Sequence, residues 1–518
     1  MKLIQIKIDG YKHLKNTCVD FNNRPDGELF HDGIPIRFFI GLNGSGKSVF
    51  LEAICLLFSR IVQDEVPGFD FTLIYEIWRD GNYRVEVTNK GADGGLLIRV
   101  KQEGEERELV LSSFDNHREF LPDYVLTCAS GANNNFYDIM VSSPRDSLQS
   151  DLFDLSLLGQ SMSDEAERER RISEILRSLK RLEENPICMF IDEKNAVLAL
   201  AAFLSVLPGG AGTEEAGIQM KCRKMILSRV SDQPCPVSLS FILDAKRADE
   251  IKDELPQYGP VFGSAYWDTL RLYQDETVDA EDSHSDRVLT FLFEPCREES
   301  GVSVRYVKSL TEGYEDPVEF LSKLVLARNR GILKECHLTF RLRGTEDILE
   351  ENALSEGEYM YLVRMGLLAM GRQKHSAQCL FLYDEPDVYL NEHWNIDFVS
   401  DIQKIFEGSG VMHEIVIATH SSLMLTDAFP EQLYYFRQKN GAVNCQSIRA
   451  STFGGSRNEI MESLFGTEHS VGSYSYGRVK KLLEEEEDVE KLEACLKMVG
   501  SWYLRLRLLD KIHLLKDR

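Results

Sequence analysis

The sequence predicts an α/β fold in which a largely parallel β-sheet with flanking helices carries a phosphate-binding loop. Residues 41–48 have the sequence Gly-Leu-Asn-Gly-Ser-Gly-Lys-Ser, which fits the nucleotide-binding pattern G-x-x-x-x-G-K-[ST]. The run Ile36–Ile40 before the loop is apolar enough for a buried strand, and residues 49–58 after it repeat apolar side chains at helical spacing. A second apolar run, residues 379–383, is typical of a parallel strand and ends in Asp384 and Glu385.

Length and composition limit the classes of protein to consider. The chain has 518 residues, enough for about three domains of ordinary size, and 43% of them are hydrophobic, so a large core is possible. The formal net charge of −25 disfavours a surface devoted to nucleic acid, so any DNA or RNA contact must come from a local basic patch. Eleven cysteines occur singly, without a C-x-x-C pair, which indicates neither a zinc site nor a disulfide framework.

The sequence also gives an expectation about membranes. Residues 1–7 alternate like a strand and lack the apolar core of a signal peptide. No apolar run approaches the roughly 18 residues that predict a membrane span. We therefore expect a cytoplasmic protein without a membrane partner.

Short strands surround the phosphate loop in the first 150 residues. Ile4, Ile6 and Ile8 alternate with polar residues, and residues 17–21 form a second predicted strand. Asp80-Gly81 supplies the tight turn of a hairpin between residues 71–79 and 82–88, and residues 96–100 continue the pattern. We expect an antiparallel β-layer beside the nucleotide.

One further strand of this region, residues 123–127, leads to a polar loop. That loop contains residues 133–135, three asparagines. It either reaches the nucleotide site or is a plain surface connection.

Phosphate binding requires the residue types found in this loop. Glycines let the backbone N–H groups turn towards an anion, and the following helix offers its positive end. Lys47 is placed to reach the β- and γ-phosphates, and the Ser48 hydroxyl is placed to ligate Mg²⁺. The residues expected to bind the nucleotide here are Gly41, Asn43, Gly44, Ser45, Gly46, Lys47 and Ser48.

Residues 151–334 differ in character and are expected to form a mainly helical insertion. Basic residues between Arg168 and Arg181 interleave with apolar residues at helical spacing. This helix face either meets DNA phosphates or is a solvated face paired with Glu167, Glu169 and Glu174. The insertion itself names no activity.

Two apolar runs end in Asp-Glu, so their neighbours must distinguish them. In a phosphate-loop enzyme the first acid lies beside Mg²⁺ and the second orients or deprotonates the attacking water. Asp384 and Glu385 are preceded by a helix opening, Leu354-Ser355-Glu356-Gly357-Glu358, and followed by an apolar strand that ends before His420. Nothing comparable flanks Asp192-Glu193, which we interpret as structural or regulatory.

These motifs together resemble the ATP-binding-cassette head of the SMC, RecF and OLD group. The shared elements are G-x-N-G-S-G-K-S, L-S-x-G-E, D-E-P and T-H-S in this order, with Gly10-Tyr11-Lys12 between the opening strands. The resemblance covers roughly residues 1–130 and 335–430. It implies an ATPase with ATP and Mg²⁺ as cofactors, in which Lys47 holds phosphate, Asp384 and Ser48 support the metal, Glu385 is the catalytic base and His420 senses the γ-phosphate.

The resemblance also implies a second subunit. Ser355 and Gly357 match the signature that caps the γ-phosphate of a partner, which agrees with the anion-binding character of a helix N-terminus. A head-to-tail homodimer, or a higher even oligomer, with ATP at the interface follows.

Three features depart from the family pattern. Glu356 replaces the usual second glycine of the signature. The family's glutamine loop is not identifiable, and residues 133–135 are the candidate for its place. Residues 387–391 replace the two histidines that follow D-E-P in many OLD-like heads.

The C-terminal part, residues 431–518, is expected to hold a hairpin around Asn440-Gly441 and then helices. Its last helix carries apolar residues that either dock a partner or pack on the chain's own head. These residues are Trp502, Tyr503, Leu504, Leu506 and Leu508. The segment contains neither a D-x-D motif with a partnering glutamate nor an HNH-like cluster, unlike the nuclease domain of OLD proteins.

We therefore expect four segments: residues 1–150 and 335–430 as the two halves of the head, the insertion 151–334, and a partner-docking segment 431–518. This layout looks similar, more loosely, to ATPase subunits of bacterial anti-phage systems of the Septu type, which work with a separately encoded nuclease. The leading hypothesis is an ATP-hydrolysing, dimerising switch that gates such an effector in response to nucleic acid or a phage trigger. Alternatives are a RecF-like DNA repair or recombination ATPase and an ATP-assembled scaffold with little turnover.

Overall fold

The chain forms two compact units, Met1–Phe453 and Gly454–Arg518, and each is described by itself. The computed structural model describes residues 1–22, 34–90, 94–130, 136, 169–173, 175, 187–207, 213–230, 233–244, 287–293, 306–311, 314–329, 331–343, 347–372, 378–408, 413–448, 450–466 and 471–516. The asparagines 133–135 and most of the basic segment 168–181 lie outside these residues, so both interpretations of each remain as stated.

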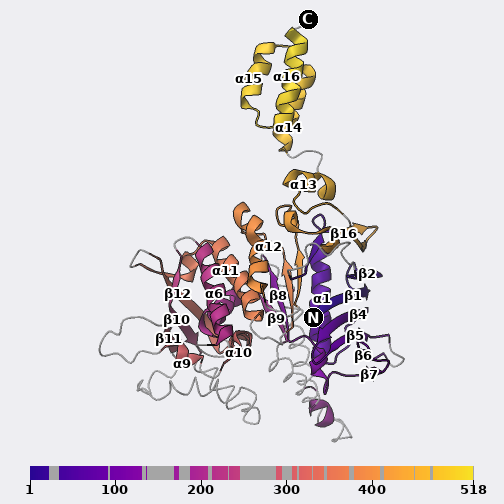
Figure 1. The fold of residues 1–518 in the computed structure, drawn as a ribbon, viewed down its shortest axis with the longest axis vertical. Helices are drawn as coiled ribbons and strands as arrows, with labels where there is room; N and C mark the ends of the chain where they lie inside the picture. The colour runs from indigo at the N-terminus through magenta and orange to yellow at the C-terminus, as the bar shows by residue number, and fades with distance from the viewer. Residues whose placement is uncertain are drawn as a thin grey trace, which may run out of the picture. The chain divides into compact units, whose positions relative to one another are not determined.

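A seven-stranded sheet forms the centre of the first unit, in the order β17-β16-β3-β15-β14-β8-β9 (Figure 1). Its strands are β3 (Ile36–Ile40), β8 (Tyr124–Ala129), β9 (Cys188–Ile191), β14 (Cys379–Asp384), β15 (Glu414–Ala418), β16 (Leu433–Lys439) and β17 (Ala442–Ser447). All neighbours pair in parallel except β16 and β17. Every residue of β3, β14 and β15 is buried, because both faces of these strands are covered. The predicted α/β fold is confirmed.

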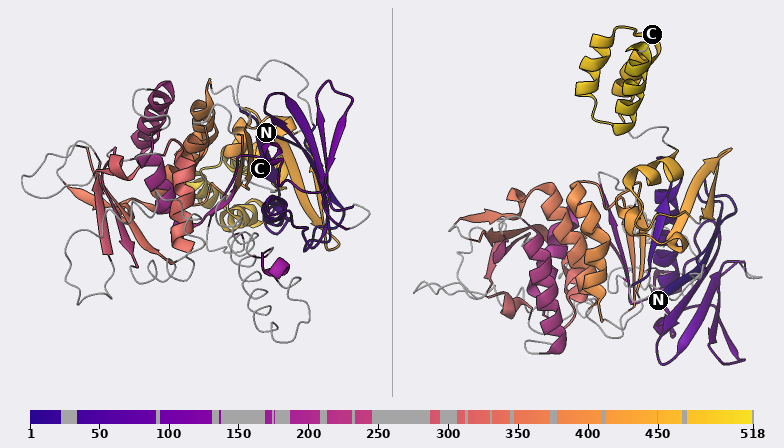
Figure 2. Two further views of the ribbon diagram at one scale, coloured as in Figure 1. Left: turned by 90° about the horizontal axis from the view of Figure 1, so that it is seen from below. Right: turned by 45° about the horizontal axis from the view of Figure 1, so that its top comes forward.

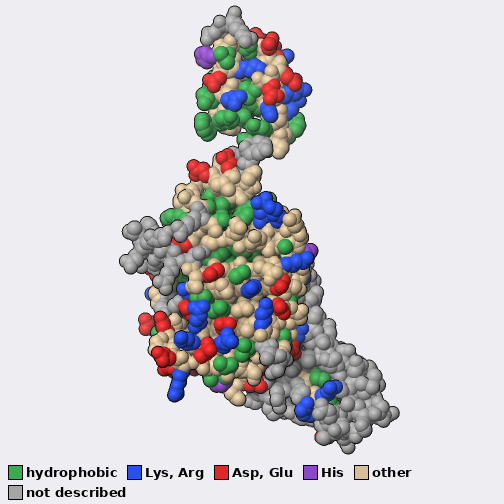
Figure 3. Space-filling view, turned by 90° about the vertical axis from the view of Figure 1, so that its right-hand side faces the viewer, with side chains coloured by type: hydrophobic (Ala, Val, Ile, Leu, Met, Phe, Trp, Pro, Cys, Tyr) green, Lys and Arg blue, Asp and Glu red, His purple; other side chains and the backbone are tan. Residues whose placement is uncertain are grey.

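An antiparallel sheet of six strands forms the predicted β-layer, in the order β2-β1-β4-β5-β6-β7. Its strands are β1 (Lys2–Asp9), β2 (Thr17–Asp20), β4 (Asp70–Trp78), β5 (Asn82–Thr88), β6 (Leu97–Gln102) and β7 (Glu108–Leu111). The hairpin at Asp80-Gly81 is confirmed by the β4–β5 register. On its outer face, basic and acidic side chains are interspersed (Figure 3). Arg99 of β6 forms an ion pair with Glu86 of β5.

Helix α1 (Lys47–Val62) lies between these two sheets (Figure 1 and Figure 2). It begins directly after the phosphate loop and is buried almost all round, because one side faces the β-layer and the other faces the seven-stranded sheet. Phe58 approaches Tyr75 of the β-layer, whereas Phe50 packs against Phe39 of β3. The loop is thus held between two sheets by a rigid helix.

The other face of the seven-stranded sheet is covered by α5 (Glu193–Ser205), α11 (Glu356–Gly371) and α12 (Glu392–Phe406) (Figure 1). Two glycines permit the close packing of α11. A Cβ on Gly366 would lie 3.0 Å from the Phe203 ring, and one on Gly371 would lie 2.4 Å from the Phe381 ring. Polar side chains cap all three helices at their N-termini.

The described part of the insertion contains strands as well as the predicted helices. Strand β9 joins the seven-stranded sheet, and a second sheet has the order β11-β10-β12-β13. The strands of this sheet are β10 (Cys235–Leu243), β11 (Arg287–Leu292), β12 (Leu333–Arg341) and β13 (Ile348–Glu350). The helices of this region are α6 (Glu214–Arg229), α9 (Val307–Leu310) and α10 (Pro317–Asn329). Among the described residues of 151–334 more lie in helices than in strands, and the strands are an addition that the sequence did not predict.

Arg229 ties this insertion to the head. Its guanidinium pairs with Asp397 at 2.8 Å and with the buried Asp401 at 2.7 Å, both on α12.

Short 3-10 helices occur at Arg118–Phe120, Glu351–Ala353, Met424–Asp427 and Pro430–Gln432.

The second unit contains α13 (Arg457–Phe465) and a small bundle with its own apolar core. The helices of the bundle are α14 (Ser473–Glu485), α15 (Val489–Met498) and α16 (Trp502–Lys516). Leu504 and Leu508 are buried against Val479 and Leu492 of the same unit, whereas Trp502, with 75% of its surface exposed, is accessible.

The boundary at Phe453 differs from the expected one at residue 431, since the predicted hairpin at Asn440-Gly441 is β16–β17 of the main sheet. No helix within the described residues is long and apolar enough to cross a membrane.

Candidate functional site

The phosphate loop leaves the carboxyl end of β3 in a shape that needs its glycines. Gly41, Gly44 and Gly46 all have positive φ angles, of 148°, 76° and 101°. A Cβ on Gly41 would lie 2.4 Å from the Phe436 carbonyl oxygen, and one on Gly46 would lie 2.5 Å from Cγ2 of Val443. The β16–β17 hairpin therefore packs directly against the loop, a contact that the sequence did not predict.

Lys47 directs its ammonium group into the loop. Its Nζ donates to the carbonyl oxygens of Gly41 at 3.0 Å and of Leu42 at 3.4 Å. The side chain is buried, and burial lowers its pKa despite the nearby acids Glu385 and Asp384. Within the described residues the buried Ser45 hydroxyl has no hydrogen-bond partner, so it remains able to donate to a phosphate oxygen.

Ser48 and Asp384 meet at the start of α1, 336 residues apart in sequence. The Ser48 hydroxyl donates a hydrogen bond of 3.0 Å to Oδ1 of Asp384. Burial raises the pKa of Asp384 to about 6, while the Ser48 hydrogen bond opposes the shift. A hydroxyl and a carboxylate are hard oxygen donors, and Mg²⁺ uses one or two such protein ligands and keeps the rest of its shell for water and phosphate. The pair fits the predicted Mg²⁺ site.

Glu385 and His420 follow two neighbouring parallel strands. Asp384 of β14 is in register with Ala418 of β15, and the Glu385 N–H donates to the Ala418 carbonyl at 2.8 Å. The Glu385 carboxylate then lies 3.4 Å from Nδ1 of His420. This hydrogen bond lowers the pKa of Glu385 and raises the pKa of His420. Glu385 has a φ of 49°, unusual for a residue with a side chain, so the turn is set by its surroundings.

Thr419 and Asp387, at the same edge of the sheet, were not predicted as site residues from the sequence. The Thr419 hydroxyl donates to Oδ1 of Asp387 at 2.6 Å and accepts from the Ser421 N–H at 2.9 Å. The Thr419 N–H also donates to the Phe39 carbonyl of β3 at 3.0 Å. Thr419 thus joins three of the site's segments, and the only sequence signals were its place in T-H-S and the acid following D-E-P.

A buried arginine supports the acidic turn, by which we mean residues 384–389 after β14. Arg364 of α11 is fully buried and donates to the carbonyl oxygens of Pro386 and, at 3.2 Å, Val388. It also donates to the Ser130 hydroxyl at 2.6 Å, and that hydroxyl donates to the Glu385 carbonyl at 2.7 Å. A single arginine within an otherwise apolar helical run was the available signal.

The signature residues lie elsewhere. Ser355 is exposed and caps α11, accepting from the Glu358 N–H at 3.3 Å, while its own N–H donates to the Glu358 carboxylate at 3.1 Å. Within the described residues no hydrogen bond joins Ser355 to the phosphate loop. A Cβ on Gly357 would lie 2.5 Å from the Tyr389 carbonyl, so this glycine permits contact with the turn after Glu385. Glu356, the departure from the family pattern, is exposed.

Asp192, the rival acid, serves a helix. Its carboxylate accepts a hydrogen bond of 2.7 Å from the Asn195 N–H and thereby caps α5. Strand β9 lies at the edge of the sheet, separated from β14 by β8. An aspartate that follows a strand can therefore cap the next helix without belonging to a nucleotide site. For this reason an apolar run that ends in Asp-Glu does not by itself distinguish the two roles.

A family match covers the first part of the chain. Residues 1–110, which contain the phosphate loop, match the model of the AAA ATPase domain family. Comparison with curated proteins gave no match. Among solved structures, the Smc head domain with an extended coiled coil bound to the C-terminal domain of ScpA from Pyrococcus furiosus has 16% sequence identity and a TM-score of 0.34, covering 86% of this chain and 96% of that one.

The SMC head domain from Thermotoga maritima has 11% identity and a TM-score of 0.34, with 87% of this chain and 100% of that chain covered. The SmcHead bound to the C-winged helix domain of ScpA has 15% identity and a TM-score of 0.31, with 87% and 98% covered. The family match includes the phosphate loop, and the interpretation of the remaining site rests on its own geometry.

Proposed function

We propose that the chain is an ATP-hydrolysing switch whose heads dimerise around ATP. The observation that carries this proposal is the convergence of Lys47, Ser48, Asp384, Glu385 and His420 at the carboxyl ends of three adjacent strands. A cation, a metal-binding oxygen pair and a base–histidine pair are the groups that phosphoryl transfer to water needs. ATP and Mg²⁺ are the expected nucleotide and metal.

Each group has a distinct role in this proposal. Lys47 and the loop N–H groups bind the phosphates, while bound Mg²⁺ would neutralise charge on the phosphate oxygens. Glu385 accepts the proton of the attacking water, since its lowered pKa keeps it ionised at neutral pH. His420, whose pKa is raised by Glu385, is available in its protonated form to donate to a γ-phosphate oxygen.

A second subunit would complete the site. Ser355 and Glu356, at the start of α11, are exposed, and within the described residues no hydrogen bond joins them to the chain's own phosphate loop. A helix N-terminus is a ready anion site, so this end of α11 suits the γ-phosphate of a partner. The dimer is therefore head to tail, with each ATP between a loop and the opposite signature.

The test is complementation between two inactive chains. Lys47→Ala removes the loop cation, and Ser355→Arg blocks the signature, so each homodimer has no intact site. Mixing the two chains should restore partial ATPase activity, because one composite site then keeps both wild-type halves. If the mixture stays inactive while Glu385→Gln chains remain monomeric with ATP, the site is complete within one chain and the dimer is refuted.

We further propose that this switch gates a separate nuclease or other effector in anti-phage defence. The second unit supports a docking role, since Trp502 and Leu506 of α16 are exposed while Leu504 and Leu508 fill its own core. No cluster of three or more His, Cys, Asp or Glu side chains suited to a metal occurs within the described residues. The acids with a defined site, Asp384 and Glu385, belong to the ATP site.

The effector proposal has a direct biochemical test. The purified chain, incubated with plasmid, single strands or RNA and with Mg²⁺ or Mn²⁺ and ATP, should not cut them. Cleavage should appear only with a co-purifying protein and should respond to Glu385→Gln. Cleavage by the chain alone that is lost in an acid mutant outside the ATP site would refute the proposal, and salt-insensitive nanomolar DNA binding would favour a RecF-like repair ATPase instead.

A further inference from the structure

Thr419 is a fully buried residue between β15 and His420, and its hydroxyl makes two hydrogen bonds. It donates to Oδ1 of Asp387 at 2.6 Å and accepts from the Ser421 N–H at 2.9 Å. Because a buried hydroxyl is costly unless it is hydrogen-bonded, these two bonds favour one conformation of the turn. The residues on both sides of His420 are thereby tied to the acidic turn.

The ring of His420 has little packing to hold it. Its side chain is 46% exposed, and its Nδ1 lies 3.4 Å from the Glu385 carboxylate. A functional side chain keeps its geometry only where neighbouring hydrogen bonds fix the segment that carries it. The Thr419–Asp387 hydrogen bond supplies this constraint, because Thr419 immediately precedes His420.

Asp387 also acts electrostatically on the two cations of the site. The hydrogen bond with Glu385 raises the pKa of His420, burial opposes this shift, and the Asp387 carboxylate raises the pKa further. Lys47 acts on His420 in the opposite direction. Burial lowers the pKa of Lys47, and Asp387 is among the acids that oppose that shift. The acidic turn therefore directs a second negative charge, besides that of Glu385, towards His420.

We propose that Asp387 is a positioning residue for the histidine that senses the γ-phosphate: it fixes the turn that carries His420 through the Thr419 hydroxyl, and its carboxylate stabilises positive charge on the imidazole. This inference rests on the proposed ATPase, in which protonated His420 donates to a γ-phosphate oxygen. In this role Asp387 acts on the phosphate through His420 and does not bind it.

Three variants separate the hydrogen bond from the charge. Asp387→Asn keeps an oxygen that can accept from Thr419 but removes the charge. Thr419→Val keeps the shape of the side chain and removes the hydroxyl, whereas Thr419→Ser keeps the hydroxyl. We expect about tenfold lower kcat in Thr419→Val, as for loss of a hydrogen bond to a charged group. Thr419→Ser should recover most of this loss.

Asp387→Asn should change the pH dependence of turnover. Loss of the carboxylate lowers the pKa of His420, so the alkaline limb of the kcat profile, where His420 loses its proton, should move to lower pH. On the acid side of this limb ATP binding should not weaken, because the variant removes a negative charge from the neighbourhood of the triphosphate.

The effect of Asp387 on His420 can also be measured without nucleotide. In the full chain labelled at histidine Cε1, the His420 signal is identified by its loss in His420→Gln, and its NMR titration gives the pKa. A lower pKa of His420 in Asp387→Asn than in the wild type supports the proposal whether or not the chain hydrolyses ATP. Failure of this inference is therefore distinguishable from failure of the ATPase proposal.

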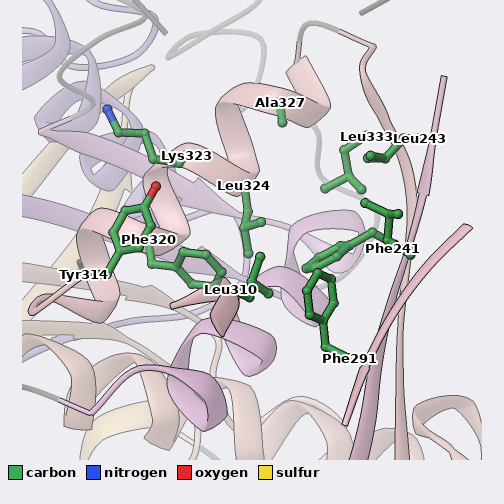
Figure 4. A pocket seen from close by; sticks show the side chains of 11 residues that line it. Phe241, Leu243, Phe291, Leu310, Tyr314, Phe320, Lys323, Leu324, Ala327 and Leu333 are labelled. Atoms are coloured by element: carbon green, nitrogen blue, oxygen red, sulfur yellow. The ribbon is translucent and has the colours of Figure 1, made fainter. Parts of the chain in front are cut away.

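Leu324→Ala is the control for a general loss of stability. Leu324 lines a cavity of about 50 Å³ between the insertion's sheet and helices α9 and α10, which shares no lining residue with the phosphate site (Figure 4). This variant enlarges the cavity and should lower stability while leaving kcat and its pH profile unchanged. The proposal is overturned if Asp387→Asn leaves the pKa of His420 unchanged, or if folded Thr419→Val turns over ATP as fast as the wild type.

Discussion

The Glu385 carboxylate lies 3.4 Å from Nδ1 of His420, and the two residues follow adjacent parallel strands. This geometry holds the proposed base in its ionised form beside a cation. Glu385→Gln keeps the shape and a hydrogen-bonding group but cannot accept the proton of water. We expect ATP binding to be retained and turnover to fall by about 10²- to 10⁴-fold, the usual contribution of a general base.

The matched control is Asp192→Asn at the rival Asp-Glu pair. Asp192 caps α5, and asparagine caps a helix about as well as aspartate, so Asp192→Asn should leave both stability and turnover nearly unchanged. Steady-state ATPase assays and fluorescent ATP titrations measure both variants. Loss of turnover in Asp192→Asn with retention in Glu385→Gln would show that the roles of the two pairs are reversed.

Gly46→Ala should disable the phosphate loop for two reasons. Its φ of 101° is unfavourable for a residue with a Cβ, and the added atom would lie 2.5 Å from Val443. Gly44 also has a positive φ, of 76°, but a Cβ there meets nothing within 4 Å. We expect Gly44→Ala to weaken ATP binding by no more than its backbone strain of about 1–2 kcal/mol. Gly46→Ala should weaken ATP binding more than Gly44→Ala does, because it adds the steric conflict with Val443 to a similar strain.

Isothermal titration with ATP compares the two glycine variants. Val443→Ala in the Gly46→Ala background should restore part of the lost affinity, because it removes the steric conflict and leaves only the backbone strain. Equal effects of Gly44→Ala and Gly46→Ala, without any rescue, would show that the hairpin does not press on the loop.

The sequence predicted the site where motifs and local patterns coincide. Strands β3, β14 and β15 are mostly apolar runs, so their ends, and therefore the positions of Lys47, Asp384 and His420, are predictable from the sequence. The parallel order of these strands then brought the three groups to one edge. The sequence thus predicted where each strand ends, whereas the distances between the three groups depend on how the strands pair in the sheet.

The residues that support the site were not predictable in this way. Arg364 and Ser130 meet although 234 residues separate them, and Val443 covers Gly46 from a hairpin that was assigned to another segment. The sheet β10–β13 was likewise missed, since β10 pairs with β12 about a hundred residues later. Such contacts depend on tertiary packing, which leaves no periodic signal within a window of the chain.

Arg364 is expected to position the acidic turn rather than to touch ATP. Arg364→Leu would leave the carbonyls of Pro386 and Val388 and the Ser130 hydroxyl without their donor. We expect a loss of about 3 kcal/mol or more in unfolding free energy, together with a lower kcat, while the dissociation constant for ATP changes little. Denaturant titration and ATPase kinetics measure these effects.

Arg372→Leu, at the C-cap of the same helix, is the matched control. Arg372 donates to one carbonyl, that of Glu407, at 2.7 Å, and has no contact with the acidic turn within the described residues. Its replacement should lower stability modestly and leave kcat unchanged. A fall of kcat in both variants that follows the loss of stability alone would argue against a positioning role for Arg364.

His413 should make the protein less stable in mild acid. Its imidazole is fully buried before β15, where Nδ1 accepts a hydrogen bond of 3.3 Å from the Cys379 N–H. Burial lowers the pKa of His413 to about 3, well below the value of about 6.5 in an unfolded chain. Between these values only the unfolded state binds the proton, so the free energy of unfolding falls as pH decreases below about 6.5.

The size of this effect follows from linkage. One such histidine should lower the unfolding free energy by about 1.4 kcal/mol between neutral pH and pH 5.5. His413→Asn keeps an acceptor for the Cys379 N–H and does not titrate, so the wild type should lose about 1.4 kcal/mol relative to this variant over the same interval. Urea unfolding of both chains at pH 7.5 and pH 5.5 measures the difference. Equal pH dependence in the two chains would mean that His413 gains a proton in the folded state and is therefore open to water.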